Sequence, residues 1–274
     1  VIRREKVRCF MDSIVYLDDH FVSPSEAKIS VFDLSILRGY GISDYFRTYE
    51  REPFHLEDHL DRLERSAKEM EIILPKNSQE ITLLVKEAIT RLPNSELGFK
   101  IIVTGGASSD QYMPDGPPKF IMIVTPIVPY SKMFYEEGIR LITHNFARAF
   151  PLAKTIEYTA AILGMKKASR CGVQEVLYLD SKDNLLEAGK ANFFAFKNGT
   201  LITPSEGIVK GITRKIVLEV AEGVFPIEER KISKEEIPLF DEAFITSGTQ
   251  GVLPVIQIDK HLIGTGKVSP HVRT

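Results

Sequence analysis

Residues 192–204 read NFFAFKNGTLITP, and this stretch decides which fold class the sequence favours. Two apolar runs, NFFAFK and TLITP, flank the pair Asn198-Gly199. An Asn-Gly pair between two such runs is a strong signal for a two-residue hairpin turn, because both residues tolerate a positive φ. The sequence therefore predicts an antiparallel β-hairpin here, and hence a sheet in the second half of the chain.

Further short runs of apolar residues predict strands on both sides of this hairpin. They lie at residues 13–19, 28–33, 45–50, 98–104, 119–125, 138–144, 175–180 and 242–259. Apolar residues at helical spacing predict amphipathic helices from Leu56 to about Glu71, over 81–92, from about Glu157 to Arg170, and after Thr213. Successive strands lie too close in sequence for right-handed crossovers, so the pattern favours an α+β fold over a doubly wound sheet.

A stretch with two prolines at residues 126–131 is typical of a linker between two domains. Residues 1–125 form the predicted small N-terminal domain, an α/β sandwich, and residues 132–274 form a larger, sheet-rich domain. A chain of 274 residues with 43% hydrophobic residues can bury two cores of unequal size. Residues 1–10 (VIRREKVRCF) lack the later patterning and are predicted to be a flexible extension.

The composition argues against several classes of partner. The 35 basic and 37 acidic side chains give a formal charge of −2, which does not suggest binding to nucleic acid or to an anionic membrane. No run approaches the roughly 18 apolar residues of a membrane helix. Cys9 and Cys171 are too few for a disulfide framework or a cysteine zinc site, so we expect a reducing cytoplasm, no metal and small-molecule partners.

Two ionisable residues stand in apolar surroundings that favour chemistry. Lys154 lies in AFPLAKTIEYTAA (149–161), where apolar neighbours favour a neutral, nucleophilic amine. The alternative is an ordinary surface lysine. Glu187 lies in NLLEAGKANFF (184–194), before a strand that must be buried, where a carboxylate fits the partner of a protonated ring nitrogen. The alternative is a solvent-exposed glutamate in a turn.

Three places could bind a phosphate group. Residues 211–213 (GIT) open a predicted helix, whose backbone N–H groups and positive dipole end attract a dianion. Residues 247–249 (SGT) follow a predicted strand, where a turn could expose amides to an anion. Arg62 adds a fixed charge on the helix that begins near Leu56. The alternatives are an ordinary helix cap, an ordinary β-turn and a solvated arginine.

Six blocks of sequence together resemble a known group of enzymes. The blocks are DLSILRGYGISDYFRTYE (33–50), HLEDHLDRLERSA (55–67), LAKTIEYTAA (152–161), LLEAGKANFF (185–194), VKGITRK (209–215) and ITSGTQGVLPV (245–255). In this order they resemble the fold type IV enzymes of pyridoxal 5′-phosphate, which comprise branched-chain aminotransferases, D-amino acid aminotransferases and aminodeoxychorismate lyases. The resemblance extends from Ser13 to Lys267 and implies the two-domain α+β fold of that group.

The resemblance implies that pyridoxal 5′-phosphate is held as an aldimine by Lys154, with Glu187 at the pyridine nitrogen. The other residues that it implies for cofactor binding are Arg62, Tyr158, Val209, Ile212, Thr213, Gly248 and Thr249. It also implies a ping-pong transfer in which an amino acid displaces Lys154, the freed amine moves a proton, and a 2-oxo acid leaves. Members of the group are homodimers with the site near the subunit interface, so we expect the same here.

The substrate is left open between branched-chain and D-amino acids. The usual D-amino acid enzymes place an arginine where this sequence has Gly105 and Gly106, whereas Arg38 and Lys190 resemble basic residues of an unusual D-amino acid subset. The candidate substrate-binding residues are Arg38, Tyr40, Tyr45, Lys100 and Lys190. The alternative is that these cations lie at the surface or at a dimer rim and that the tyrosines pack against the sheet.

Two other functions remain open at this point. An aminodeoxychorismate lyase, which yields 4-aminobenzoate and pyruvate, would use the same lysine and cofactor but needs no 2-oxo acid acceptor. A non-catalytic cofactor-binding or dimer-forming homologue would keep only the fold, and the presence of both Lys154 and Glu187 argues against it. A transaminase is therefore the main prediction.

Overall fold

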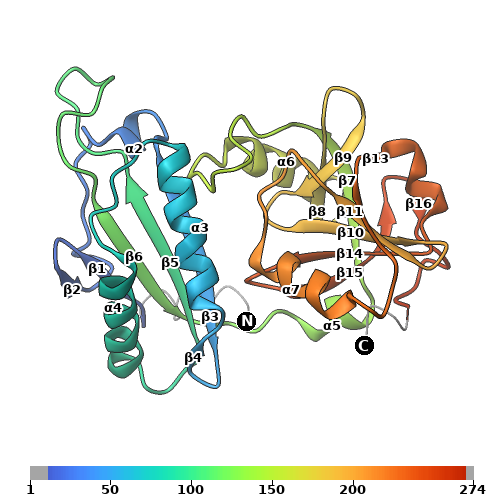
Figure 1. Ribbon diagram of the computed structural model, residues 1–274, viewed down its shortest axis with the longest axis horizontal. Coiled ribbons are helices and arrows are strands. Elements are labelled where there is room, and N and C mark those ends of the chain that lie inside the picture. The colour runs from blue at the N-terminus through green and yellow to red at the C-terminus, as the bar shows by residue number, and fades with distance from the viewer. Residues whose placement is uncertain (1–11, 270–274) are drawn as a thin grey trace. The chain divides into compact units, whose positions relative to one another are not determined.

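The chain forms two compact units in the computed structural model, which describes residues 12–269 (Figure 1). The first unit comprises the chain up to Pro129 together with Ala153–Glu157. The second comprises Tyr130–Leu152 and the chain from Tyr158 onward. The segment that carries Lys154 therefore packs with the first unit, although the sequence analysis places it in the larger domain. The extension expected at residues 1–10 lies outside the described residues.

The first unit is built on a six-stranded antiparallel sheet with the order β2-β1-β6-β5-β3-β4. Its strands are β1 (Ile14–Leu17), β2 (His20–Val22), β3 (Gly41–Tyr49), β4 (Glu52–Pro53), β5 (Leu97–Thr104) and β6 (Phe120–Pro126). Its helices are α2 (Leu34–Leu37), α3 (Leu56–Glu69) and α4 (Ser78–Arg91). The apolar stripes of α3 and α4 pack on the sheet in one buried cluster, as their spacing predicts.

One strand prediction in this unit is wrong. Residues 28–32 adopt irregular and turn structure in place of the strand expected at 28–33. The side chain of Asp33 accepts a hydrogen bond from the Ser35 amide (2.8 Å) and so caps the short helix α2. Its other carboxylate oxygen accepts from the Thr104 hydroxyl at 2.8 Å. These local bonds compete with a strand ladder, because a carboxylate that binds nearby backbone amides favours a helix start.

The second unit is built on a ten-stranded sheet with the order β12-β11-β10-β14-β15-β7-β8-β9-β13, and β16 pairs with β15. Its strands are β7 (Ile139–Asn145), β8 (Glu175–Leu179), β9 (Asn184–Ala188), β10 (Asn192–Lys197), β11 (Thr200–Pro204), β12 (Ile227–Arg230), β13 (Ile232–Ser233), β14 (Glu242–Ser247), β15 (Gly251–Ile258) and β16 (His261–Leu262). Its helices are α5 (Lys132–Glu136), α6 (Thr159–Arg170), α7 (Ile212–Ala221) and the 3₁₀ segment Lys234–Leu239. The abundance of sheet agrees with the expected character of this half.

The predicted hairpin is confirmed. Strands β10 and β11 pair antiparallel, with Lys197 opposite Thr200. Between them Asn198 and Gly199 have φ values of 53° and 76°, the geometry that the Asn-Gly pair predicts for a two-residue turn.

Three strand pairs run parallel, namely β7 with β8, β15 with β7, and β11 with β12. The helix α6 connects β7 to β8, so one crossover exists where the sequence spacing had argued against such connections. Most of the other pairs are antiparallel, and the α+β fold class is confirmed. Within the described part of the chain, every helix is too short or too polar to span a lipid bilayer.

Candidate active site

The main chain around Lys154 lies along the edge of β3 in the first unit. The Ser43 amide donates to the Lys154 carbonyl at 2.8 Å, and the Ile156 amide donates to the Gly41 carbonyl at 3.1 Å. The Lys154 amide donates to the hydroxyl of Ser66 on α3 at 3.0 Å. Three hydrogen bonds thus fix the backbone on either side of this half-buried lysine. The sequence gave no sign of this contact, because Ser43 and Ser66 lie far from Lys154 along the chain.

A buried carboxylate holds Arg62 in the same unit. Asp44 on β3 is 1% exposed, and its two oxygens accept from Arg62 Nε and Nη2, both at 2.8 Å. The Nδ1 atom of His59 lies 2.7 Å from Asp44 Oδ1. Burial acts to raise the pKa of the Asp44 carboxyl, but Arg62 and His59 outweigh it and hold that pKa well below its usual value. Asp44 therefore fixes the orientation of Arg62, whose binding of phosphate stays a prediction.

Replacing Asp44 by asparagine is expected to destabilise the protein strongly. Loss of the carboxylate leaves the buried Arg62 without its fork partner, which costs about 3–5 kcal/mol in comparable cases. The folded pKa lies below the unfolded one, so this carboxylate contributes fully at neutral pH and the contribution is lost as pH falls through the unfolded and then the folded value. Urea unfolding at neutral and acid pH measures both effects. Asp61→Asn, an exposed change on α3, is the matched control, and equal losses in the two variants would contradict the assignment.

A second buried carboxylate, Glu187, lies in the second unit. Glu187 belongs to β9 and is 3% exposed, so the alternative of a solvent-exposed turn glutamate is wrong. One oxygen forms an ion pair with Arg148 Nε. The other lies 3.3 Å from both Asn192 Nδ2 and the Val209 amide, which donate to it. The carboxylate is therefore held in a fixed position by three donors from three segments.

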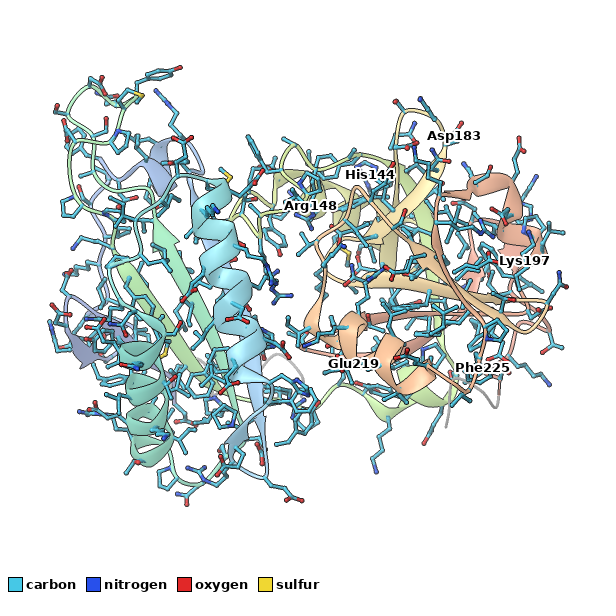
Figure 2. The ribbon with its side chains drawn as sticks, viewed as in Figure 1. His144, Arg148, Asp183, Lys197, Glu219 and Phe225 are labelled. Carbon is cyan, nitrogen blue, oxygen red and sulfur yellow. The ribbon has the colours of Figure 1, made fainter. Side chains whose placement is uncertain are left out.

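Arg148 is the residue of this network that the sequence analysis missed (Figure 2). Burial acts to lower its pKa, but the charge and hydrogen bond of Glu187 outweigh that effect and raise it. The guanidinium carbon lies 5.7 Å from the centre of the Tyr158 ring, so Tyr158 joins the group around Glu187. A signal was present: in NFARAF (145–150) a lone arginine stands between apolar residues directly after a strand. An arginine there needs a buried partner.

Asn192 connects Glu187 to the start of α7. Its Nδ2 donates to the Val209 carbonyl at 2.7 Å, and the Gly211 amide donates to its Oδ1 at 3.1 Å. A side chain at position 211 would not fit, since a Cβ there would lie 2.2 Å from Asn192 Oδ1. Because this N-cap residue is a glycine, it offers no side chain to the first amides of the helix, where Ile212 and Thr213 lie. The helix start can accept an anion as predicted.

The turn with Gly248 and Thr249 lies at the same edge of the sheet. Asn192 is the cross-strand partner of Thr246, one residue before Ser247 ends β14. The hydroxyls of Ser247 and Thr249 lie 3.1 Å apart. The register therefore brings two of the predicted phosphate-binding places to one edge of the second unit.

The predicted substrate residues are divided between the units. In the first unit Tyr45 and Lys100 are cross-strand partners, and Arg38 is exposed. The Tyr40 hydroxyl donates to the Met70 carbonyl at 2.6 Å, which favours the alternative that Tyr40 packs against the core. In the second unit Lys190 is exposed and lines a pocket of about 400 Å³ together with Tyr158 and α6. The binding roles of these residues stay predictions.

Comparison with known proteins now assigns the family. Residues 41–258 match the family model described as amino-transferase class IV. The chain belongs to this family. Class IV aminotransferases depend on pyridoxal phosphate, so the enzyme class and the resemblance seen in the six sequence blocks are confirmed.

Named relatives of this class IV aminotransferase fall into two groups. A protein named as a branched-chain-amino-acid aminotransferase of Methanocaldococcus jannaschii is 33% identical over 93% of this chain and 91% of its own. The D-alanine aminotransferase of Staphylococcus epidermidis is 27% identical over 94% of each chain. The branched-chain aminotransferase of T.th., solved with pyridoxamine 5′-phosphate, has a TM-score of 0.87 and 26% identity over 95% of this chain and 90% of that one.

Proposed function

We propose that this class IV aminotransferase binds pyridoxal 5′-phosphate and moves an amino group between a branched-chain amino acid and a 2-oxo acid. The observation that carries the proposal is the buried Glu187 carboxylate, which three donors hold beside Val209 and Tyr158. A fixed, buried acid of this kind suits a protonated pyridine nitrogen. The names of the Methanocaldococcus relative and of the T.th. structure support the choice of substrate.

The residues of the second unit fit this cofactor. Among residues 12–269, the Thr246 hydroxyl is buried and has no hydrogen-bond partner. Thr246 is paired with Asn192, and directly opposed residues share one face of a sheet, so the hydroxyl lies on the face where Asn192 meets Glu187. A buried polar atom without a partner is costly, and a polar ligand at this face would satisfy it. The start of α7 supplies amides for a phosphate nearby.

The proposed roles follow from the chemistry of each side chain. When bound, pyridoxal phosphate supplies an electron sink that stabilises negative charge on the substrate carbon. The Lys154 amine would bind the cofactor and move the proton at the substrate carbon, while Glu187 would hold the proton of the ring nitrogen. Val209 would pack on the ring and Tyr158 would orient it. Phosphate binding is proposed for the side chain of Arg62 and for the amides of Ile212, Thr213, Gly248 and Thr249.

D-amino acids are the second candidate substrates. The D-alanine aminotransferase relative and the two exposed cations Arg38 and Lys190 favour them. Lysine binds a carboxylate as a point charge and not as a fork, so Lys190 would supply attraction more than orientation. The homodimer and the cytoplasmic location stay predictions from the resemblance and the composition.

The cofactor spectrum distinguishes these substrates. We expect the purified enzyme to change to the pyridoxamine form with L-leucine, L-isoleucine or L-valine, and to return when 2-oxoglutarate is added. A change with D-alanine or D-glutamate alone would reject the branched-chain substrate and favour the second candidate. Absence of any change, combined with pyruvate release from aminodeoxychorismate, would reject transamination and support the lyase.

A further inference from the structure

The turn between β14 and β15 is held by a buried glutamine that the sequence analysis did not single out. Gln250 is 5% exposed, although a glutamine in a hairpin turn usually lies in solvent. Its amide lies 3.2 Å from Ser247 Oγ, to which it donates, and the same hydroxyl donates to Gln250 Oε1 at 3.1 Å. Ser247 also contacts the Thr249 hydroxyl. The glutamine therefore closes the turn on itself around Ser247.

The other polar groups of Gln250 bind the segment that enters the second unit. Its Nε2 donates to the Tyr130 hydroxyl at 2.8 Å, and the Tyr135 hydroxyl donates to its carbonyl at 2.8 Å. Tyr130 is the first residue of the second unit and lies in the linker expected at 126–131, and its ring lies 5.6 Å from that of Phe134. Gln250 thus joins the turn to this segment through both its side chain and its main chain.

We propose that Gln250 is a positioning residue, which holds the Gly248–Thr249 turn in the form that accepts the cofactor phosphate, and that Tyr130 is its partner. The proposal rests on the proposed function, which gives this turn a phosphate to bind, and it adds the residues that shape the turn. Amides bind an anion well only if they are fixed beforehand, because ordering them on binding costs conformational entropy. Gln250 supplies that order from both sides of the turn.

The arrangement also couples the turn to the linker. A shift of Tyr130 would break the hydrogen bond to Gln250 Nε2 and leave a buried amide without its partner, which is unfavourable. Phosphate binding that fixes the turn therefore stabilises the observed position of Tyr130, and the reverse holds by linkage. The connection between the two units is in this way sensitive to the cofactor.

Affinity for pyridoxal phosphate and for pyridoxal, titrated into the apoenzyme, tests the proposal without any turnover. We expect Gln250→Ala and Tyr130→Phe each to weaken pyridoxal phosphate binding by about tenfold, the size of one lost hydrogen bond. Pyridoxal, which lacks the phosphate, should bind all variants alike. The double variant should be no weaker than Gln250→Ala alone, because both changes remove the same bond. Tyr49→Phe, a hydroxyl removal on β3, is the matched control and should bind like the parent.

The outcomes separate this proposal from the proposed function. A parent enzyme that binds the two compounds equally tightly would reject a phosphate site at this turn and the role of Gln250 with it. A parent with a strong preference for pyridoxal phosphate that Gln250→Ala retains would overturn the positioning role alone. Equal weakening for both compounds would show a general loss of structure. Gln250→Glu, which keeps the acceptor for Ser247, and melting temperatures of all variants identify a folding defect.

Discussion

Replacing Lys154 by alanine is expected to abolish the borohydride-reducible bond between enzyme and cofactor and to lower turnover by at least about a thousandfold. The reason is the loss of the amine that would bind the cofactor and move the proton. The fold should survive, because the backbone of Lys154 is held by Ser43 and Ser66 through main-chain atoms that alanine keeps. Borohydride reduction followed by mass spectrometry, together with single-turnover kinetics, measures both effects.

Two controls make this result specific. Lys182→Ala removes an exposed lysine from a turn of the second unit and should leave reduction and turnover unchanged. Added methylamine should restore part of the turnover of Lys154→Ala, because a small amine can occupy the space of the lost side chain. A reducible bond that persists in Lys154→Ala would show that another lysine binds the cofactor.

The local features of the fold were predictable because their causes lie within a few residues. The hairpin at Asn198-Gly199 depends on two residues that accept positive φ, and it is confirmed. The capping box at Ser233 and Glu236 is confirmed for the same reason. The strand expected at 28–33 failed where Asp33 had the choice of a ladder or a helix cap, which apolar periodicity does not decide.

The contacts that hold the candidate site were not predictable because they join distant parts of the chain. Arg148 is 39 residues from Glu187, and Arg62 is 18 residues from Asp44. Each ion pair depends on strand register and on helix packing, which a single sequence does not reveal. The resemblance named the residues with cofactor roles and left out those that position them, such as Asp44 and Gln250. Resemblance carries over the reacting groups, whereas their supports differ with each chain.

Glu187→Gln is the second change with a large expected effect. Two sets of donors face the carboxylate, Arg148 on one oxygen and Asn192 with Val209 on the other. A glutamine amide has one oxygen, so its NH2 group must face one set of donors and leave it unpaired. We expect turnover to fall about a hundredfold or more, because a neutral amide cannot hold the proton of the ring nitrogen. Single-turnover kinetics and cofactor content measure the two consequences separately.

A conservative variant distinguishes the chemical role of Glu187 from a structural one. Glu187→Asp keeps the charge and the partner of Arg148 but shortens the side chain, so it should recover part of the rate that Glu187→Gln loses. Glu219→Gln, on the exposed face of α7, is the control and should turn over like the parent. If Glu187→Gln retained full turnover, the ring nitrogen would have no acid partner at this position. If both Glu187 variants lost cofactor and melted equally early, the carboxylate would serve only to neutralise Arg148.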